Sequence, residues 1–207
     1  MSAPDKSILA RRCLPNPAGR RIGLFGGSFN PAHNGHRQIA LTALKALQLD
    51  QIWWLVAPQN PLKDPRDIDD FSERLALTKI MANHPRFVVC DAEKYLGTKT
   101  TAETLQKLSP ILNQGQFVWI MGADSFASLH RWHHWREIPA RLPLAVMDRP
   151  GFALKAISSP AGRILAKYRL PRRQKTALAD KNTPAWVFLS LPLRHESSTA
   201  IRQARKS

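Results

Sequence analysis

Two histidines, His33 and His36, stand three residues apart shortly after a glycine pair, Gly26 and Gly27. A strand-length apolar run, residues 22–25, leads into the glycines, and a helical pattern follows. Glycines after a strand let the backbone turn sharply and approach a ligand, and the N–H groups that open a helix favour anions. Imidazoles at this spacing can face one phosphate chain. The pattern therefore predicts a phosphate-binding turn.

Other interpretations of this segment compete with phosphate binding. No Gly-Lys-Ser/Thr follows, so it is not a Walker A loop, and it lacks the G-x-G-x-x-G spacing of dinucleotide dehydrogenases. Two histidines can also simply cap a helix or pack against a sheet. A zinc site would need Cys or carboxylate ligands at suitable spacing, and none lies nearby, so we expect no metal-ligating residues.

Three further segments carry polar groups where a ligand could bind. Gly122 ends a buried strand and places Asp124 at the carboxyl end of that strand. Thr101 is a plausible helix N-cap, with Thr104 at the capping-box position. Near the C-terminus, Ser198, Thr199 and Arg202 begin a short helix, where hydroxyl, backbone N–H and guanidinium groups can meet phosphates.

The elements that must position these residues alternate along the chain. Strand-length runs are expected at residues 22–25, 52–57, 87–90, 117–121, 144–147 and 186–189, with helices at 35–47, 72–83, 102–108, 154–168 and from 198. Such alternation, with runs that are apolar on both faces, is typical of a parallel sheet covered by helices. We predict an α/β fold, a Rossmann-like doubly wound parallel sheet with helices on both faces. Residues 1–20 are expected to be a flexible lead-in to one domain at 21–207.

Composition narrows the class of protein. The 207 residues are 43% apolar, and 31 Lys+Arg against 15 Asp+Glu give a net charge of +16, which attracts polyanions. Nucleic acid, an anionic membrane and small phosphorylated substrates all qualify, and the basic stretch 163–175 could equally be solvated surface. No apolar run reaches membrane-spanning length. The only cysteines, Cys13 and Cys90, are expected to be free thiols, which favours the cytoplasm.

The segment GGSFNPAHNGH, residues 26–36, resembles the N-terminal signature of the nucleotidylyltransferase superfamily, in the form found in bacterial nicotinate-nucleotide adenylyltransferases. Asn30 stands where Asp is commoner. The resemblance implies that the first part of the signature binds ATP and that Asn30 binds the acceptor substrate. The resemblance also implies that the ATP-binding residues of this segment are Gly26, Gly27, Ser28, Phe29, His33 and His36.

Four downstream segments resemble the same family in order. They imply a phosphate-binding Lys63, an acceptor contact at Thr101, and Gly122 and Asp124 at the ATP ribose. They further imply that Trp132 stacks on the acceptor's pyridine ring and that Ser198, Thr199 and Arg202 bind ATP. The segment DRPG, residues 148–151, also matches a short family signature. Thr100 replaces the family's usual Tyr, and Glu196 replaces an apolar residue.

The resemblance implies transfer of AMP from ATP to nicotinate mononucleotide, giving deamido-NAD and pyrophosphate. The catalytic residues would be His33, His36, Lys63 and Arg202, with Mg²⁺ carried mainly by the ATP phosphates. The nearest alternative acceptors are nicotinamide mononucleotide and phosphopantetheine. A basic nucleic-acid-binding protein is a remote alternative, since no helix-turn-helix, RNP or zinc-finger pattern occurs. We expect no nucleic-acid or membrane partner, and a homo-oligomer is possible.

Overall fold

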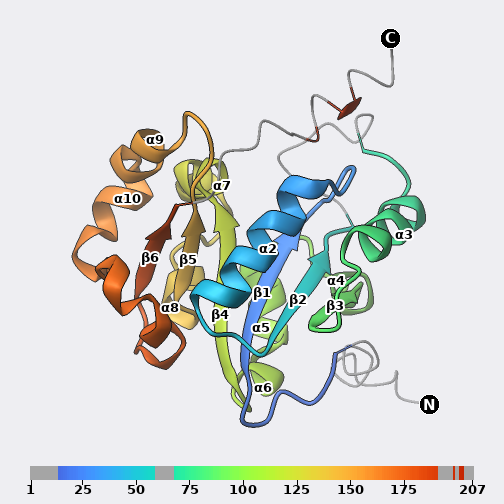
Figure 1. The fold of residues 1–207 in the computed structure, drawn as a ribbon, viewed down its shortest axis with the longest axis horizontal. Coiled ribbons are helices and arrows are strands. Elements are labelled where there is room, and N and C mark those ends of the chain that lie inside the picture. Colours follow the sequence, from blue (N-terminus) through green and yellow to red (C-terminus); the bar gives the residue numbers. More distant parts are fainter. Residues whose placement is uncertain (1–13, 59–67, 191–197, 199–200, 203–207) are drawn as a thin grey trace.

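A computed structural model describes residues 14–58, 68–190, 198 and 201–202. Its centre is a sheet of six parallel strands in the order β3-β2-β1-β4-β5-β6 (Figure 1). The strands are β1 (Arg21–Gly27), β2 (Gln51–Val56), β3 (Phe87–Cys90), β4 (Gln116–Gly122), β5 (Leu144–Met147) and β6 (Trp186–Leu189). Each predicted strand is present, and the order is that of a doubly wound Rossmann-type sheet.

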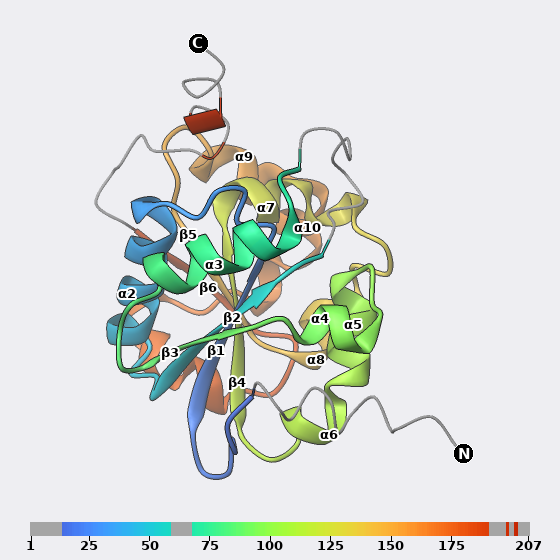
Figure 2. The same ribbon diagram turned by 90° about the vertical axis from the view of Figure 1, so that its right-hand side faces the viewer.

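Helices cover both faces of the sheet, as predicted (Figure 2). One face packs against α2 (Asn34–Ala46), α3 (Phe71–Met81) and the 3-10 segment η4 (Arg172–Asp180). The other packs against α4 (Ala92–Leu96), α5 (Thr101–Lys107), α6 (Ser109–Leu112), α7 (Ala123–Ser128), α8 (Glu137–Arg141), α9 (Ala153–Ser158) and α10 (Pro160–Ile164). Two apolar clusters, one on each face, therefore form the core.

The sequence of the central strands explains why they are buried. Trp53, Trp54 and Leu55 of β2 are each 0% exposed, and in β4 the most exposed apolar side chains reach only 3%. Successive side chains of a strand point to opposite faces, so an unbroken apolar run fits a strand covered on both sides. The strand order reverses between β1 and β4, and ligands of such sheets bind beyond the carboxyl ends of the strands at that point.

The prediction of one helical stretch over residues 154–168 was wrong. Ser159 interrupts it in an extended conformation and becomes the N-cap of α10, where its hydroxyl accepts from the Gly162 N–H. Pro160 stands at the first helical position, which it favours because it has no N–H to satisfy. The stretch therefore divides into α9, α10 and η3 (Ala166–Tyr168).

The segment before β1 is also part of the packed structure. Leu14 is 6% exposed and belongs to the same core cluster as Cys90. Cys90 is disulfide-bonded, so its prediction as a free thiol was wrong, and the described part of the chain has no free cysteine. None of the helices that the structure describes is long and apolar enough to cross a membrane.

Candidate active site

The glycine turn forms the end of β1. A Cβ atom at Gly26 would lie 2.4 Å from the Trp119 ring, which is itself 2% exposed on β4. A side chain there would have to displace a buried indole, so glycine is required for β1 and β4 to meet at this edge. At Gly27 the nearest atom to a Cβ would be in the Phe29 ring, at 3.2 Å.

His33 and His36 form the N-terminal cap of α2. His33 is the N-cap residue, and its Nδ1 accepts from the Gly35 N–H at 3.1 Å. The His36 Nδ1 accepts from the His33 N–H at 3.2 Å, completing a reciprocal capping box. The two ring centroids are 3.9 Å apart. The two histidines therefore cap the helix and also lie side by side. Helix capping and a pair of adjacent imidazoles, which the sequence left as alternatives, occur together.

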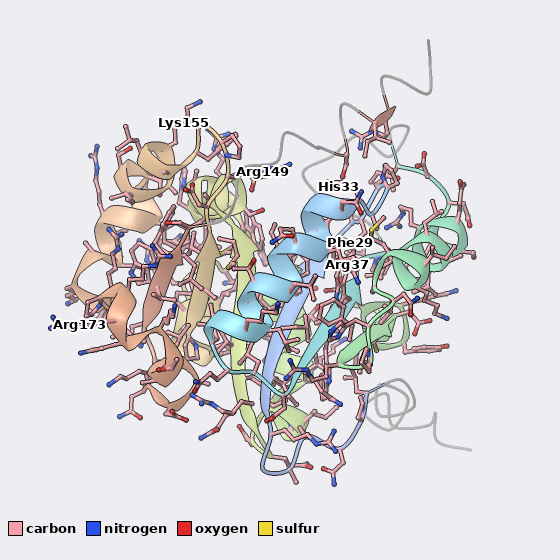
Figure 3. The ribbon with its side chains drawn as sticks, in the orientation of Figure 1. Phe29, His33, Arg37, Arg149, Lys155 and Arg173 are labelled. Atoms are coloured by element: carbon pink, nitrogen blue, oxygen red, sulfur yellow. The ribbon has the colours of Figure 1, made fainter. Side chains whose placement is uncertain are left out.

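The cap fixes the tautomer of both rings. A ring nitrogen that accepts a backbone N–H is unprotonated, so the proton of the neutral imidazole lies on Nε2. The Nε2–H group of His36, which is partly exposed, can then donate to an anion at the N-terminus of α2, whereas Nε2 of His33 is buried in this structure. Figure 3 shows His33 at that end of the helix, beyond the carboxyl ends of the strands.

Phe29 and Asn30 are buried between the glycines and the histidines. The Phe29 ring is 2% exposed, with its centroid 5.1 Å from those of His36 and Trp54, so only the backbone of Phe29 is available to a ligand. Asn30 is 0% exposed, and its Oδ1 accepts from the Asp69 N–H. This contact is structural, and substrate binding by Asn30 stays a prediction.

Arg74 of α3 fastens this turn to the end of β2. It is 1% exposed, and its guanidinium donates to the carbonyl oxygens of Ser28, Ala57, Pro58 and Asp69 at 2.6 to 3.0 Å. A buried charge is tolerated where such acceptors surround it. Sequence reasoning missed Arg74 because an arginine within a helical pattern resembles an ordinary surface residue.

The C-terminal segment docks on the same turn. The Ser198 hydroxyl donates to the Pro31 carbonyl at 3.1 Å, and the Arg202 guanidinium donates to the Asn30 carbonyl at 2.6 Å. The structure thus brings together predicted ATP-binding residues from opposite ends of the chain. Lys63 and Thr199, also predicted, lie outside the described residues.

Gly122 and Asp124 lie where β4 leads into α7, on the β4 side of the point at which the strand order reverses. Gly122 is the N-cap of α7, and a Cβ atom there would lie 2.4 Å from Asp124 Oδ1. The other carboxylate oxygen, Oδ2, pairs with the guanidinium of Arg149, which follows β5 (Figure 3). The sequence assigned no role to the DRPG segment. In the structure the arginine of this segment, Arg149, pairs with Asp124 in the first turn of α7.

A cavity of about 300 Å³ opens beside the glycine turn. Predicted site residues Gly26, Gly27, Ser28, Thr101 and Trp132 line it. Its wall continues through Ala57, Glu93, Lys99, Thr100, Trp119, Ser125, Ser128, Arg131 and His133. The cavity therefore joins the glycine turn, predicted to bind phosphate, to the two residues predicted to hold an aromatic acceptor ring.

The helix beside this cavity begins one residue earlier than predicted. Thr100, not Thr101, is the N-cap of α5, and its hydroxyl accepts from the Glu103 N–H while the Glu103 carboxylate accepts from the Thr100 N–H. The pairing is a Thr-x-x-Glu capping box, a pattern visible in the sequence. Thr101 consequently occupies the first turn of α5, and both Thr100 and Thr101 line the cavity.

Several ionisable side chains on the cavity wall were not predicted as site residues from the sequence. Lys99, Arg131 and His133 line the cavity, together with one carboxyl group, that of Glu93. Glu93 is 8% exposed, and burial raises its pKa to about 8. Near neutral pH the wall therefore carries basic groups and a predominantly uncharged acid, which suits an anionic ligand.

The sequence profile of the Cytidylyltransferase-like family matches residues 24–204. Two curated relatives carry the name "Probable nicotinate-nucleotide adenylyltransferase". One, from a Bradyrhizobium species, is 48% identical over 182 residues, or 88% of this chain and 95% of the relative. The other, from Roseobacter denitrificans, is 46% identical over 185 residues, or 89% and 92%.

Solved structures agree on the fold. Plasmodium falciparum nicotinic acid mononucleotide adenylyltransferase complexed with NaAD superposes with a TM-score of 0.65 at 15% identity, covering 89% of this chain and 83% of that one. The same protein complexed with APC gives 0.63. The chain belongs to the Cytidylyltransferase-like family of nucleotidyltransferases and, within it, to the nicotinate-nucleotide adenylyltransferases.

Proposed function

We propose that the chain transfers AMP from ATP to the 5′-phosphate of nicotinate mononucleotide and releases pyrophosphate. The observation that carries this proposal is the continuity of the glycine–histidine turn with a cavity that Thr101 and Trp132 line. One end has donors suited to a polyphosphate, and the other has an aromatic ring beside basic side chains. The names of the relatives support the choice of acceptor.

The chemistry needs no nucleophile from the protein. The acceptor's phosphate is ionised at neutral pH and attacks the α-phosphorus of ATP in line, breaking its bond to the leaving pyrophosphate. Catalysis is then mainly positioning and electrostatic stabilisation. His33 and His36 would donate from Nε2 to the ATP phosphates, with His36 as the donor to charge that develops in the transition state.

Other predicted residues would surround ATP. Gly26, Gly27, Ser28 and Phe29 would offer backbone groups, and Gly122 would leave room for the ribose beside Asp124. Lys63, Ser198, Thr199 and Arg202 would neutralise or bind the phosphate chain. The hydrogen bonds of Ser198 and Arg202 to the turn support their part in this assignment.

The acceptor would occupy the cavity. Trp132 would stack on its pyridine ring, and backbone N–H groups at the start of α5, by Thr101, would face its carboxylate with a favourable helix dipole. Lys99 and Arg131 add positive charge to the same wall. An amide in place of the carboxylate would turn its NH₂ donors toward these donors and leave buried groups unpaired.

Mg²⁺ is proposed to accompany ATP on its phosphate oxygens. Among the described residues no group of three or more His, Cys, Asp or Glu side chains is placed to hold a metal ion, and Asp124 is engaged by Arg149. The described side chains do not by themselves form a magnesium site. When bound, the ion would offset phosphate charge.

A direct assay tests the proposed function. Purified protein, ATP, Mg²⁺ and nicotinate mononucleotide should yield pyrophosphate and deamido-NAD in equal amounts, identified by mass. Pyrophosphate release without an acceptor, or no release with this acceptor, would contradict the proposal. We further propose a cytoplasmic location, with no nucleic-acid or membrane partner, and leave a homo-oligomer open to a measurement of mass in solution.

A further inference from the structure

Glu93 is a buried acid that no step of the proposed reaction uses. It lies in α4, is 8% exposed, and is the only carboxyl group that the described residues contribute to the wall of the acceptor cavity. A carboxylate is an unfavourable neighbour for an anionic ligand, because like charges repel strongly where water is excluded. Its presence on this wall therefore calls for a physical account.

The Glu93 carboxyl group lies in a buried network of hydroxyl groups. The Thr104 hydroxyl hydrogen-bonds to the carboxyl group and lowers its pKa, but the effect of burial is larger. The Thr104 hydroxyl also lies 2.8 Å from the Thr98 hydroxyl and 3.0 Å from the Thr100 carbonyl. Thr98 and Thr104 are themselves buried, at 4% and 0% exposure, so the network is shielded from water.

Among the residues that the structure describes, the other ionisable side chains on this wall belong to basic residue types. Lys99 precedes α5, and Arg131 and His133 come from the segment after α7. Burial is the leading influence on Glu93 and raises its pKa to about 8. The acid is therefore mostly neutral at pH 7 and mostly ionised at about pH 9.

We propose that Glu93 is a specificity-determining residue that lets the cavity accept an anionic acceptor ring only while its carboxyl group is protonated. The inference rests on the proposed function, because it takes nicotinate mononucleotide as the acceptor. Neutral Glu93 leaves the basic groups of the wall unopposed. Ionised Glu93 places a second negative charge beside the ring carboxylate, whereas a carboxamide at the same place carries no charge to repel.

The sign of the pH effect follows from this arrangement. As pH rises through about 8, the protonated fraction falls, and productive binding of the acid falls with it. Two pH units centred on that value lower the protonated fraction about tenfold. The ratio of kcat/KM for the acid to kcat/KM for the amide should therefore fall about tenfold between about pH 7 and about pH 9. Effects of pH on ATP and on the shared 5′-phosphate cancel in this ratio.

The experiment measures that ratio across this pH range in the full-length protein, with ATP and Mg²⁺ saturating and with both mononucleotides as acceptors. Glu93→Gln keeps the shape of the side chain and removes its titration, and Glu93→Met provides a second non-titrating variant should the first fold poorly. Glu73→Gln removes an exposed carboxylate of α3 and serves as the matched control.

The expected result is a ratio that falls about tenfold in the wild type and in Glu73→Gln and stays constant in the Glu93 variants. A constant ratio in the wild type, or an equal fall in the Glu93 variants, would overturn the inference while leaving adenylyl transfer to nicotinate mononucleotide intact. No turnover of the acid at about pH 7 would overturn the proposed function, and this inference with it.

Discussion

The phosphate end and the acceptor end of the site are assembled differently. At the proposed phosphate end the contacts of the histidine cap are local: the Gly35 N–H donates to His33 and the His33 N–H to His36, within four consecutive residues. At the acceptor end the wall comes from the ends of β1 and β2, from α4, α5, α7 and the segment that carries Trp132. The histidine cap is contained in one short sequence motif, whereas the wall of the acceptor cavity forms only after the sheet has formed.

This difference predicts different responses to substitution. A change at the phosphate end should act on the chemical step or on the anchoring of the turn. A change at the acceptor end should act on the choice and affinity of the acceptor. The predictions below test that division, from the largest expected effect to the smallest.

Loss of the Arg74 guanidinium should have the largest effect on stability. Arg74→Met leaves the carbonyls of Ser28, Ala57, Pro58 and Asp69 without their donor, and unsatisfied buried groups cost about 1–3 kcal/mol each. We expect the free energy of unfolding, measured with urea, to fall by at least about 3 kcal/mol. Arg163→Met, at an exposed position, should change it by less than about 0.5 kcal/mol. Similar values for the two variants would show that Arg74 does not anchor the turn.

His36→Asn should separate capping from catalysis. The asparagine oxygen can replace Nδ1 as the acceptor of the His33 N–H, but the donor at Nε2 is lost. Without a donor to the developing phosphate charge, kcat should fall at least ~10²-fold. Circular dichroism and thermal melting should stay close to wild type. Near-normal turnover would remove His36 from the chemical step.

Thr100 and Thr101 provide a matched pair at the acceptor end. Thr100→Ala removes the N-cap of α5 and should lower the free energy of unfolding by about 1 kcal/mol. Thr101→Ala leaves the cap intact and should have a smaller effect on stability. If the Thr101 hydroxyl contacts the acceptor, that substitution should raise KM for the acceptor with little change in KM for ATP. Equal loss of stability in both variants would contradict the observed cap.

The fold could be predicted well from the sequence because its strands are unbroken apolar runs. The short helices α4, α6, α7 and α8 span four to six residues each, too few for a period of 3.6 residues to be visible. The predicted cap of α5 was one residue too late because Thr100 and Thr101 are both good caps, and the capping box that Thr100 forms with Glu103 decides between them.

The site divides in the same way. The residues of the glycine–histidine motif were predicted from their spacing, because the motif is continuous in the chain. Glu93, Arg74 and Arg149 could not be placed, since burial and partners depend on elements that the sequence separates. A charged residue within a helical pattern is usually solvated, and only tertiary packing reveals the exceptions.

The most direct test of the account is the preference between two acceptors that differ at one group. The wild-type protein should be assayed at about pH 7 with saturating ATP and Mg²⁺, using nicotinate mononucleotide and nicotinamide mononucleotide in parallel. Because the cavity presents basic groups and helix N–H donors, kcat/KM for the acid should exceed that for the amide by at least ~10²-fold. Equal values, or a preference for the amide, would contradict the assignment of the acceptor cavity.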